Sequence, residues 1–429
     1  MTPPESLRST APVQVTASTA APAATASARS LLGICFALFA AATSMSCVFA
    51  ILPSVGRDLG LSEPQIGWVV APAALVFVLF GPVWGRLGQR WPARSIFTAA
   101  LLLVAVFTLL FGFALAWRLE ARISVLLCWA LLVSSRMLLS PFSAAMLPTA
   151  QAYIAHTTDS SSRPRALASM GASFALGMVA SPGLAAIATG LGLLTPFYVV
   201  AALLVAAALC TWLWLPGKHP AAQALPQSGY RPGTAKTAWS LIRHPLAILA
   251  LLYTVYGILM QVTGFRMRDQ FHLDAAHATA HAGMALMAIA ATLVATQMGL
   301  AKIQLPSLSA QRRVVLSAGS FGLLGLLCLT ADIPFEAQLL SAALFGLSLG
   351  AFMPFTLSLL TQRAQQAGDQ TRIGGLSGAA QGLGMVVGPL LGASSYRVHP
   401  HAPYWMATAC MLLVLGLYAR SASASRAAA

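Results

Sequence analysis

The chain has 429 residues, of which 58% are hydrophobic and only 8% are charged, with a formal net charge of +15. A soluble domain carries roughly 25% charged residues, so this composition excludes an ordinary soluble protein and indicates one embedded in a lipid bilayer. The positive charge does not indicate a nucleic-acid partner, because basic loops of a membrane protein lie against anionic lipid and no nucleic-acid-binding motif accompanies them.

The chain begins with a tail, residues 1–30, that is rich in Ala, Thr, Ser and Pro. We expect this tail to be disordered and cytoplasmic, and not a cleaved secretion signal, because the first long apolar run is already a full span. Apolar runs of about 20 residues can cross the hydrocarbon layer as helices. The sequence predicts twelve such spans: 31–54, 66–84, 95–116, 124–146, 166–190, 196–215, 245–265, 282–301, 313–331, 335–361, 373–394 and 403–418.

The predicted spans fall into two sets of six. The first set occupies residues 31–216 and the second residues 244–418, with a polar segment, 217–243, between them that we expect to be a cytoplasmic linker. Residues 419–429 form a second cytoplasmic tail. The sequence therefore predicts an all-α membrane protein made of two pseudo-symmetric six-helix bundles.

A repeated phrase of small residues supports this division. Gly177-Met-Val-Ala-Ser-Pro182 recurs 207 positions later as Gly384-Met-Val-Val-Gly-Pro389, and both phrases interrupt apolar stretches. Parallel repeats of half a membrane protein are typical of transporters whose two bundles move about a central site.

The basic residues predict the orientation of the chain. Most of the 25 Lys and Arg residues fall in the tails and in the even-numbered loops when both termini are assigned to the cytoplasm. Cytoplasmic loops carry this excess of positive charge. We therefore expect a multi-pass protein of the bacterial inner membrane with both termini inside.

The loop after the second span is a short basic turn, Gly85-Arg-Leu-Gly-Gln89-Arg90-Trp-Pro-Ala-Arg94. It resembles the loop signature of the major facilitator superfamily at Gly85, Leu87, Arg90 and Arg94. It departs from that signature at Gln89, where the family has Asp. In the family this loop latches the cytoplasmic gate, so the resemblance implies gating roles for Gln89, Arg90 and Arg94. The alternative is an anchor that only fixes topology.

Two further patterns resemble the exporters of that superfamily. Arg136 is the only charged residue deep inside a predicted span, and a buried cation is costly unless it faces a polar cavity or a partner. It resembles the fourth-helix arginine of proton-driven exporters; the alternative is an arginine that reaches the interface. Gly177 and Pro182 resemble the fifth-helix pattern of exporters, and Gly384, Gly388 and Pro389 repeat it. The resemblance implies that these five positions take part in gating.

Proton coupling has few candidates in the sequence. All ten acidic residues fall in tails, loops or the ends of spans, although proton-coupled exporters usually hold a carboxylate in the cavity. Coupling could run through Asp58 or Asp269 near the outer mouth, through His281 at the start of the eighth span, or through the substrate itself. A histidine suits a proton relay because its pKa lies near neutrality.

In the superfamily, helices one, four, seven and ten line the central path, which implies candidates for substrate contact. Besides Arg136 these candidates are Met45, Cys47, Ser140, Tyr253, Tyr256, Gln261, Phe352 and Phe355. The six cysteines lie singly in predicted spans and no catalytic or nucleotide-binding motif occurs, so we expect no metal, no cofactor and no enzymatic activity. We also expect a monomer.

These observations predict a secondary transporter that exports a small organic molecule in exchange for protons, by alternating access. A cavity with one fixed cation and no fixed anion favours an anionic cargo, such as a carboxylate- or hydroxamate-bearing metal chelator of the siderophore class. The alternatives are a general drug exporter and a proton symporter that imports an organic acid. A membrane-embedded enzyme or sensor would need a soluble domain, and no loop is long enough to form one.

Overall fold

The computed structural model describes residues 28–87, 91–158, 162–217, 235–303, 307–367 and 370–427. Twelve α-helices occur in these residues, joined by short loops and one 3-10 turn, Thr189–Leu191. The first six helices are α1 (Ala28–Val55), α2 (Glu63–Leu87), α3 (Ala93–Leu119), α4 (Val125–Thr157), α5 (Arg163–Ala188) and α6 (Thr195–Trp214). The second six are α7 (Ala235–Phe271), α8 (Ala275–Lys302), α9 (Leu308–Cys328), α10 (Phe335–Ala367), α11 (Gln370–Val398) and α12 (Ala402–Ala427).

Eleven of these helices are long and apolar enough to cross a membrane, which confirms the predicted all-helical membrane fold. A spanning helix satisfies all its backbone hydrogen bonds internally, as a segment without access to water must. The exception is α9, which is 21 residues long and carries Arg312 and Arg313 in its first two turns.

Two helices extend beyond the ranges that the sequence predicts for them. The segment expected to be linker, 217–243, ends in helix, because α7 begins at Ala235. The segment expected to be a tail, 419–429, is helical to Ala427. Neither Gly nor Pro occurs between Ala235 and His244 or between Leu417 and Ala427, so nothing in the chain interrupts helix formation there. Polar composition marks where a helix leaves the apolar layer, and not where it ends.

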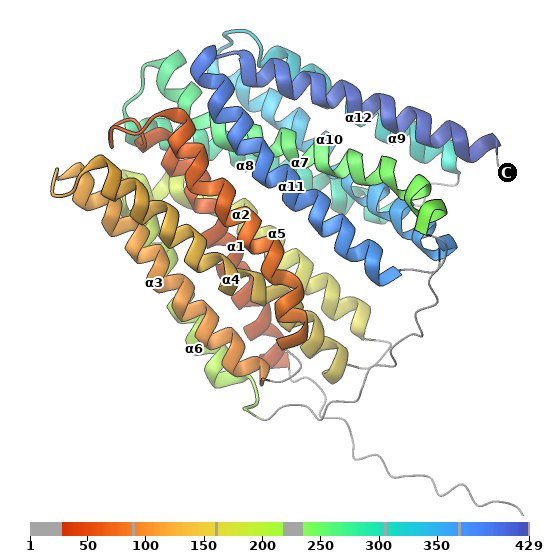
Figure 1. Ribbon diagram of the computed structural model, residues 1–429, viewed down its shortest axis with the longest axis horizontal. Helices are drawn as coiled ribbons and strands as arrows, with labels where there is room; N and C mark the ends of the chain where they lie inside the picture. Colours follow the sequence, from red (N-terminus) through yellow and green to blue (C-terminus); the bar gives the residue numbers. More distant parts are fainter. Residues whose placement is uncertain are drawn as a thin grey trace, which may run out of the picture.

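The twelve helices form two bundles that repeat each other. In the first bundle α1 packs on α5 and α6, and α3 packs on α4 and α6; in the second, α7 packs on α11 and α12, and α9 packs on α10 and α12. Figure 1 shows α1–α6 and α7–α12 side by side and separated at the end of the molecule where the C-terminus lies. The main contacts between bundles are those of α2 with α11 and of α5 with α8.

The repeated small residues explain the matching pair of helix crossings. A Cβ placed on Gly177 of α5 would contact the backbone carbonyl of Phe39 in α1. A Cβ placed on Gly384 of α11 would lie 2.6 Å from the carbonyl oxygen of Ala250 in α7. The two glycines therefore allow the same close approach of helix backbones, one in each bundle.

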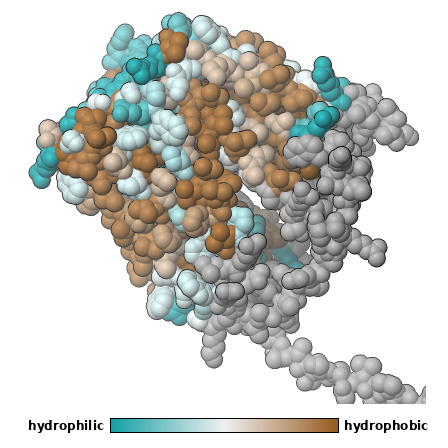
Figure 2. All heavy atoms as spheres, in the orientation of Figure 1, coloured by the Kyte–Doolittle hydropathy of each residue, from teal (hydrophilic) through white to brown (hydrophobic). Residues whose placement is uncertain are grey.

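The surface agrees with a bilayer environment. Figure 2 shows hydrophobic residues over the middle of the visible face and hydrophilic residues gathered toward the two ends. The same view shows a hollow between the bundles, near the end where they separate.

Candidate functional site

One end of the interface between the bundles is closed by helix contacts. This end carries the α1–α2 and α7–α8 loops. A Cβ on Gly67 of α2 would lie 3.0 Å from the Cβ of Ala393 in α11, and one on Gly264 of α7 would lie 2.9 Å from Pro53 in α1. A Cβ on Gly283 of α8 would contact the carbonyl of Pro182 in α5. Pro182 therefore lies where the two bundles meet.

Two ion pairs cross the interface at this closed end. Arg57, which follows α1, pairs with Asp269 of α7; one hydrogen bond from its Nη2 to Oδ2 measures 3.0 Å. Asp58 pairs with Arg268 of α7 at 2.8 Å. Arg57-Asp58 and Arg268-Asp269 are the same dipeptide, 211 positions apart. Each residue thus pairs with the opposite charge on the corresponding dipeptide of the other half.

Two more side chains hold the Arg57–Asp269 pair. Glu63 of α2 accepts a hydrogen bond of 2.9 Å from Nε of Arg57, and the Tyr396 hydroxyl of α11 donates one of 2.8 Å to Asp269. Burial lowers the pKa of Arg57, but the hydrogen bonds and ion pairs with Asp269 and Glu63 outweigh it and raise the pKa above its ordinary value. We call these six residues the gate cluster: Arg57, Asp58, Glu63, Arg268, Asp269 and Tyr396.

Arg136 lies in α4, where it is buried and forms no ion pair with any described residue. Its side chain is 6% exposed, and among the described residues no acceptor hydrogen-bonds to its guanidinium. Its electrostatic neighbour is the thiol of Cys47 in α1, which is also buried. The α1 helix packs against α7 and α8 of the other bundle, so Arg136 lies beside a helix that contacts both bundles. Ser140 donates to the carbonyl of Arg136 at 2.8 Å and is satisfied within its own helix.

Gln261 of α7 is another buried polar side chain that has no hydrogen-bond partner among the described residues. It is 1% exposed, and neither its amide nitrogen nor its amide oxygen is hydrogen-bonded within the described part of the chain. It lies on α7 between Gly257, which contacts Pro389 of α11, and Gly264, which contacts α1.

The aromatic candidates fall into two groups. Tyr253 and Tyr256 are adjacent on α7, with ring centroids 6.5 Å apart, and the Tyr253 hydroxyl lies 3.9 Å from the sulfur of Met353 in α10. Phe352 is fully buried and packs edge-on against Tyr418 of α12, inside the second bundle. Phe355 is half-buried on α10, and Met45 is half-buried on α1. The structure thus brings the tyrosines together and places Phe352 away from them.

The predicted gating residues are spread over several places. Gln89 and Arg90 lie outside the described residues. The Arg94 guanidinium stacks on the Trp212 ring of α6, 3.7 Å from its centroid, within the first bundle. Gly177, Gly384 and Gly388 pack α5 on α1 and α11 on α7 inside their bundles, whereas the Pro389 carbonyl also approaches Gly67 of the other bundle.

His281 lies two turns into α8. Its Nδ1 is 2.8 Å from the carbonyl oxygen of His277, and its ring packs edge-on against Phe335, with centroids 4.5 Å apart. Asp274 caps the start of the same helix, and the hydrogen bond from the His277 amide lowers the pKa of the Asp274 carboxyl. His281 therefore contacts the start of α10, outside the gate cluster.

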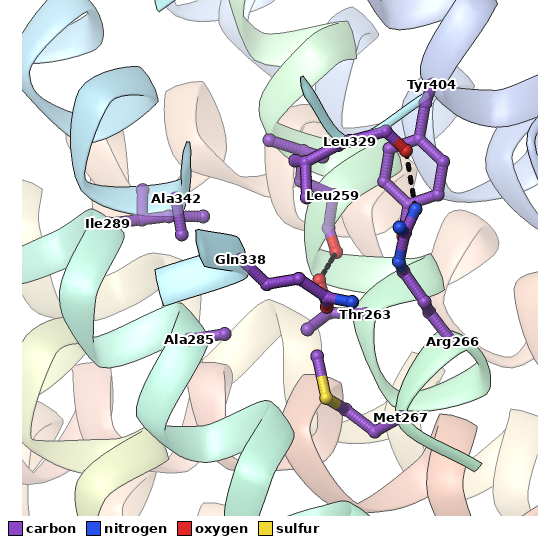
Figure 3. A pocket seen from close by; sticks show the side chains of 10 residues that line it. All are labelled: Leu259, Thr263, Arg266, Met267, Ala285, Ile289, Leu329, Gln338, Ala342 and Tyr404. Atoms are coloured by element: carbon purple, nitrogen blue, oxygen red, sulfur yellow. Dashed lines mark hydrogen bonds between the residues drawn. The ribbon is translucent and has the colours of Figure 1, made fainter. Parts of the chain in front are cut away.

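A separate small cavity lies wholly within the second bundle (Figure 3). Its volume of about 20 Å³ could hold about one water molecule. Arg266 borders it and donates hydrogen bonds of 2.5 Å to the carbonyls of Leu329 and Ala331, just after α9, while its guanidinium lies over the Tyr404 ring. Gln270 accepts a third hydrogen bond, of 2.8 Å, from Arg266. Arg266 thus ties α7 to the α9–α10 loop.

Sequence reasoning missed Arg266 and the four pairing partners Arg57, Glu63, Arg268 and Tyr396. A usable signal for two of them is the second repeat offset: the Arg-Asp dipeptide recurs at 211 positions, whereas the small-residue phrase recurs at 207. No comparable signal marks Arg266, because the predicted seventh span ends one residue before it. In the described residues no group of three or more His, Cys, Asp or Glu side chains could hold a metal ion.

Two repeated helix bundles that meet at one end, with a buried cation that has no partner in the described part of the chain, define a multi-pass membrane transporter. The chain belongs to the Major Facilitator Superfamily, whose family model matches residues 34–368. It is a secondary transporter of that superfamily and not an enzyme.

Several known proteins resemble the chain over most of its length. It is 24% identical to Multidrug resistance protein 1 of Bacillus subtilis, over 89% of this chain and 93% of that protein. It is 27% identical to Solute carrier family 22 member 18 of Rattus norvegicus, over 83% and 86%. Among solved structures, a bacterial homolog of the human lysosomal transporter Spinster in an inward-facing, occupied conformation matches with a TM-score of 0.64 at 15% identity, covering 92% of this chain and 94% of that chain.

Proposed function

We propose that this transporter exports an anionic organic molecule from the cytoplasm in exchange for protons, with a metal chelator of the siderophore class as the favoured cargo. The observation that carries the proposal is the buried guanidinium of Arg136, which has no hydrogen-bond or ion-pair partner within the described residues. A buried charge without a partner is costly, and a protein that keeps one has a function for it. Binding an anion there supplies the missing partner.

The chemistry of the guanidinium narrows the class of cargo. Arginine presents a planar fork of N–H donors that matches a carboxylate or hydroxamate oxygen pair, and such charge-assisted hydrogen bonds are roughly twice as strong as neutral ones. The amide of Gln261, which has no partner among the described residues, adds one donor group and one acceptor on α7, a helix that packs on α1 of the other bundle. A chelator with several oxygen donors suits both residues, whereas a cationic drug meets repulsion from Arg136.

The direction and setting of transport are inferred from the relatives and the charge distribution. The relatives named as multidrug resistance proteins support export. The basic loops support an inner-membrane location with both termini in the cytoplasm, and a monomer is sufficient because each chain contains both bundles. In this orientation the closed end faces outward and the separated end faces the cytoplasm, the arrangement in which an exporter takes up its cargo.

A secretion assay tests this proposal. A deletion strain, grown under iron limitation, is compared with the same strain carrying the wild-type gene or the Arg136→Ala variant, and the acidic chelators in the medium are measured. We expect secretion to fall in the deletion strain, to recover with the wild-type gene and not to recover with Arg136→Ala at equal protein level. Unchanged chelator secretion together with sensitivity to lipophilic cations such as ethidium contradicts the anionic cargo.

General drug export is the second candidate, and the two tyrosines of α7 favour it. Tyr253 and Tyr256 form an edge-on pair beside the flexible side chain of Met353, the kind of aromatic and thioether surface that accepts varied apolar ligands. Uptake by inside-out vesicles distinguishes anion export, general drug export and proton-coupled import. Accumulation of a carboxylate chelator such as citrate supports the first, accumulation of ethidium supports the second, and uptake of citrate only by right-side-out cells supports a proton symporter for import.

A further inference from the structure

The two Arg-Asp dipeptides of the gate cluster pair reciprocally across the interface between the bundles. Arg57 and Asp58 follow α1, Arg268 and Asp269 lie 211 positions later on α7, and the pairs that form are Arg57 with Asp269 and Asp58 with Arg268. Two copies of one dipeptide related by a two-fold axis between the bundles produce this reciprocal pattern, because the axis brings each residue opposite the other residue of the second copy. If one of these ion pairs had arisen by chance, a second pair at the symmetry-related position would not be expected.

We propose that these two ion pairs are a reciprocal gate, which holds this end closed and must break each time the end opens. Both pairs join α7 to the start of the α1–α2 loop, and neither can survive a separation of the bundles there. The proposal rests on the export proposed above, carried out by the alternating access that the sequence predicts, and it assigns the residues that set the balance between the closed and open states of this end. A partly exposed ion pair contributes little by itself, and two that break together shift the balance between the closed and open states further.

Glu63 and Tyr396 act as positioning residues. Glu63 belongs to the same bundle as Arg57 and accepts from its Nε, so it holds the guanidinium toward α7 and remains its partner when Asp269 withdraws. Tyr396 belongs to the same bundle as Asp269 and donates to its Oδ2. The Arg57 guanidinium also lies over the rings of Phe265 and Tyr396, 5.6 and 5.9 Å from their centroids. Each side of this pair is thus oriented by its own bundle before the gate closes.

The reciprocal pairing also fixes what a proton does at this site. Asp58 faces Arg268, and Asp269 faces Arg57 and the Tyr396 hydroxyl. A proton on either carboxylate removes a pair that forms only while the end is closed, so it favours the open state. In an exchange cycle the carrier releases its cargo outside and binds a proton there. The proton-loaded carrier must then close this outer end before it can open toward the cytoplasm. We therefore assign Asp58 and Asp269 to the gate.

A labelling experiment in whole cells tests the gate without measuring transport. Ser54 is fully buried directly beneath the cluster, where its carbonyl accepts from Arg268 at 2.8 Å. The reporter is Ser54→Cys in a chain whose exposed Cys328 is replaced by alanine, and the probe is a membrane-impermeant maleimide. Rapid labelling of native Cys328 in the unaltered chain first establishes that this end faces the reagent.

We expect slow labelling of the reporter when the gate is intact. Asp58→Asn or Asp269→Asn should each raise the labelling rate by roughly threefold to fivefold, as expected for loss of one partly exposed ion pair. The exchanged pair Asp58→Arg with Arg268→Asp should restore slow labelling, because the opposite charges again face each other. Glu120→Gln is the matched control, since it breaks the exposed Arg122–Glu120 pair in the α3–α4 loop of the same bundle and should change nothing.

Equal labelling of the two Asn variants and the unaltered gate overturns the proposal. So does a folded exchange variant that labels as fast as the single variants. A second exchange, Arg57→Asp with Asp269→Arg, decides the matter if the first fails to fold. Because labelling reports the conformation and not the cargo, a failure here leaves the proposed export intact, and a wrong cargo leaves the gate intact.

Discussion

Three buried or half-buried arginines show how the surroundings of one side chain decide its role. Arg57 is held by two carboxylates, Arg266 by two backbone carbonyls, Gln270 and an aromatic ring, and Arg136 by no described acceptor. Removal of the guanidinium exposes unsatisfied acceptors in the second case and relieves an unpaired charge in the third. The same substitution should therefore have opposite effects on stability at Arg136 and Arg266.

Arg136 and Arg266 give a paired prediction on stability. Arg266→Met should destabilise the protein by about 2 kcal/mol or more, because the carbonyls of Leu329 and Ala331 lose their donor, whereas Gln270 keeps a hydrogen bond from Gln338. Arg136→Met should leave the melting temperature in detergent unchanged or raise it, since it removes a buried charge that no side chain compensates. Thermal unfolding of the two variants and the wild type measures both effects. A large loss of stability in Arg136→Met would show that the guanidinium has a structural partner in the resting protein.

Arg136→Lys separates charge from geometry. Lysine keeps the positive charge but loses the planar fork of donors, so we expect transport of an anionic chelator to fall about tenfold, the loss that corresponds to one charge-assisted hydrogen bond. Ser134→Ala is the control on the same helix, because the Ser134 hydroxyl donates to the carbonyl of Leu131. Wild-type transport in Arg136→Lys would mean that only the potential of the site matters, and not recognition by the fork.

At the residue scale, sequence reasoning finds a residue that breaks a pattern and misses one that conforms to it. Arg136 can be found because a charge interrupts an apolar run, and the structure places it in a buried position. Arg266 cannot be found in this way, because it lies at the predicted edge of a span, where arginines are ordinary. Its role depends on the carbonyls of Leu329 and Ala331, more than 60 positions away, and only the fold brings them together.

Among the helices, the crossing of α11 over α7 gives a test with an internal control. An alanine at Gly384 would place its Cβ 2.6 Å from both the Ala250 oxygen and the Tyr253 Cβ, and backbone atoms cannot move aside cheaply. We expect Gly384→Ala to destabilise the second bundle by about 1–3 kcal/mol and to impair transport. Gly378→Ala, two turns earlier on α11, meets nothing within 4 Å and should be neutral or slightly stabilising because alanine favours helix.

The first bundle offers the same comparison at Gly177, which is crowded by Phe39, and at Gly171, which has open space. Thermal unfolding and transport are measured for all four alanine variants. If the crowded and open glycines behave alike, close packing at these crossings does not limit the protein, and the repeated phrase needs another explanation.

The existence of each helix can be predicted from the sequence far better than its length. The apolar runs predict a helix at each of the twelve places where the structure has one, because a segment in hydrocarbon has no other way to satisfy its backbone. The ends of α7 and α12 are not predictable from hydropathy, since both helices continue into polar residues. This matters for the site, because the extension of α7 past residue 265 carries Arg266, Arg268 and Asp269.

For the whole molecule, the charge moved in one transport cycle identifies the class of cargo. The charge of Arg136 returns with the carrier, so only the cargo and the exchanged proton count. Exchange of one proton for a monovalent anion moves two positive charges inward, exchange for a neutral molecule moves one, and exchange for a monovalent cation moves none. Each charge gains about 2.3 kcal/mol per 100 mV of membrane potential. An anion exporter should therefore respond to the membrane potential twice as strongly as an exporter of neutral molecules.

Proteoliposomes that contain the purified protein make this measurement possible. The potential is set with potassium and valinomycin, the pH gradient is set independently, and the accumulation of the chelator identified by the secretion assay is followed against each. At steady state we expect the logarithm of the chelator's accumulation ratio to rise linearly with each driving force, when both are expressed in millivolts. The slope against the membrane potential should be twice the slope against the pH gradient, because two charges but only one proton move. Equal slopes would indicate a neutral cargo. Dependence on the pH gradient alone would indicate a cation, in which case Arg136 repels the cargo that it is proposed to bind.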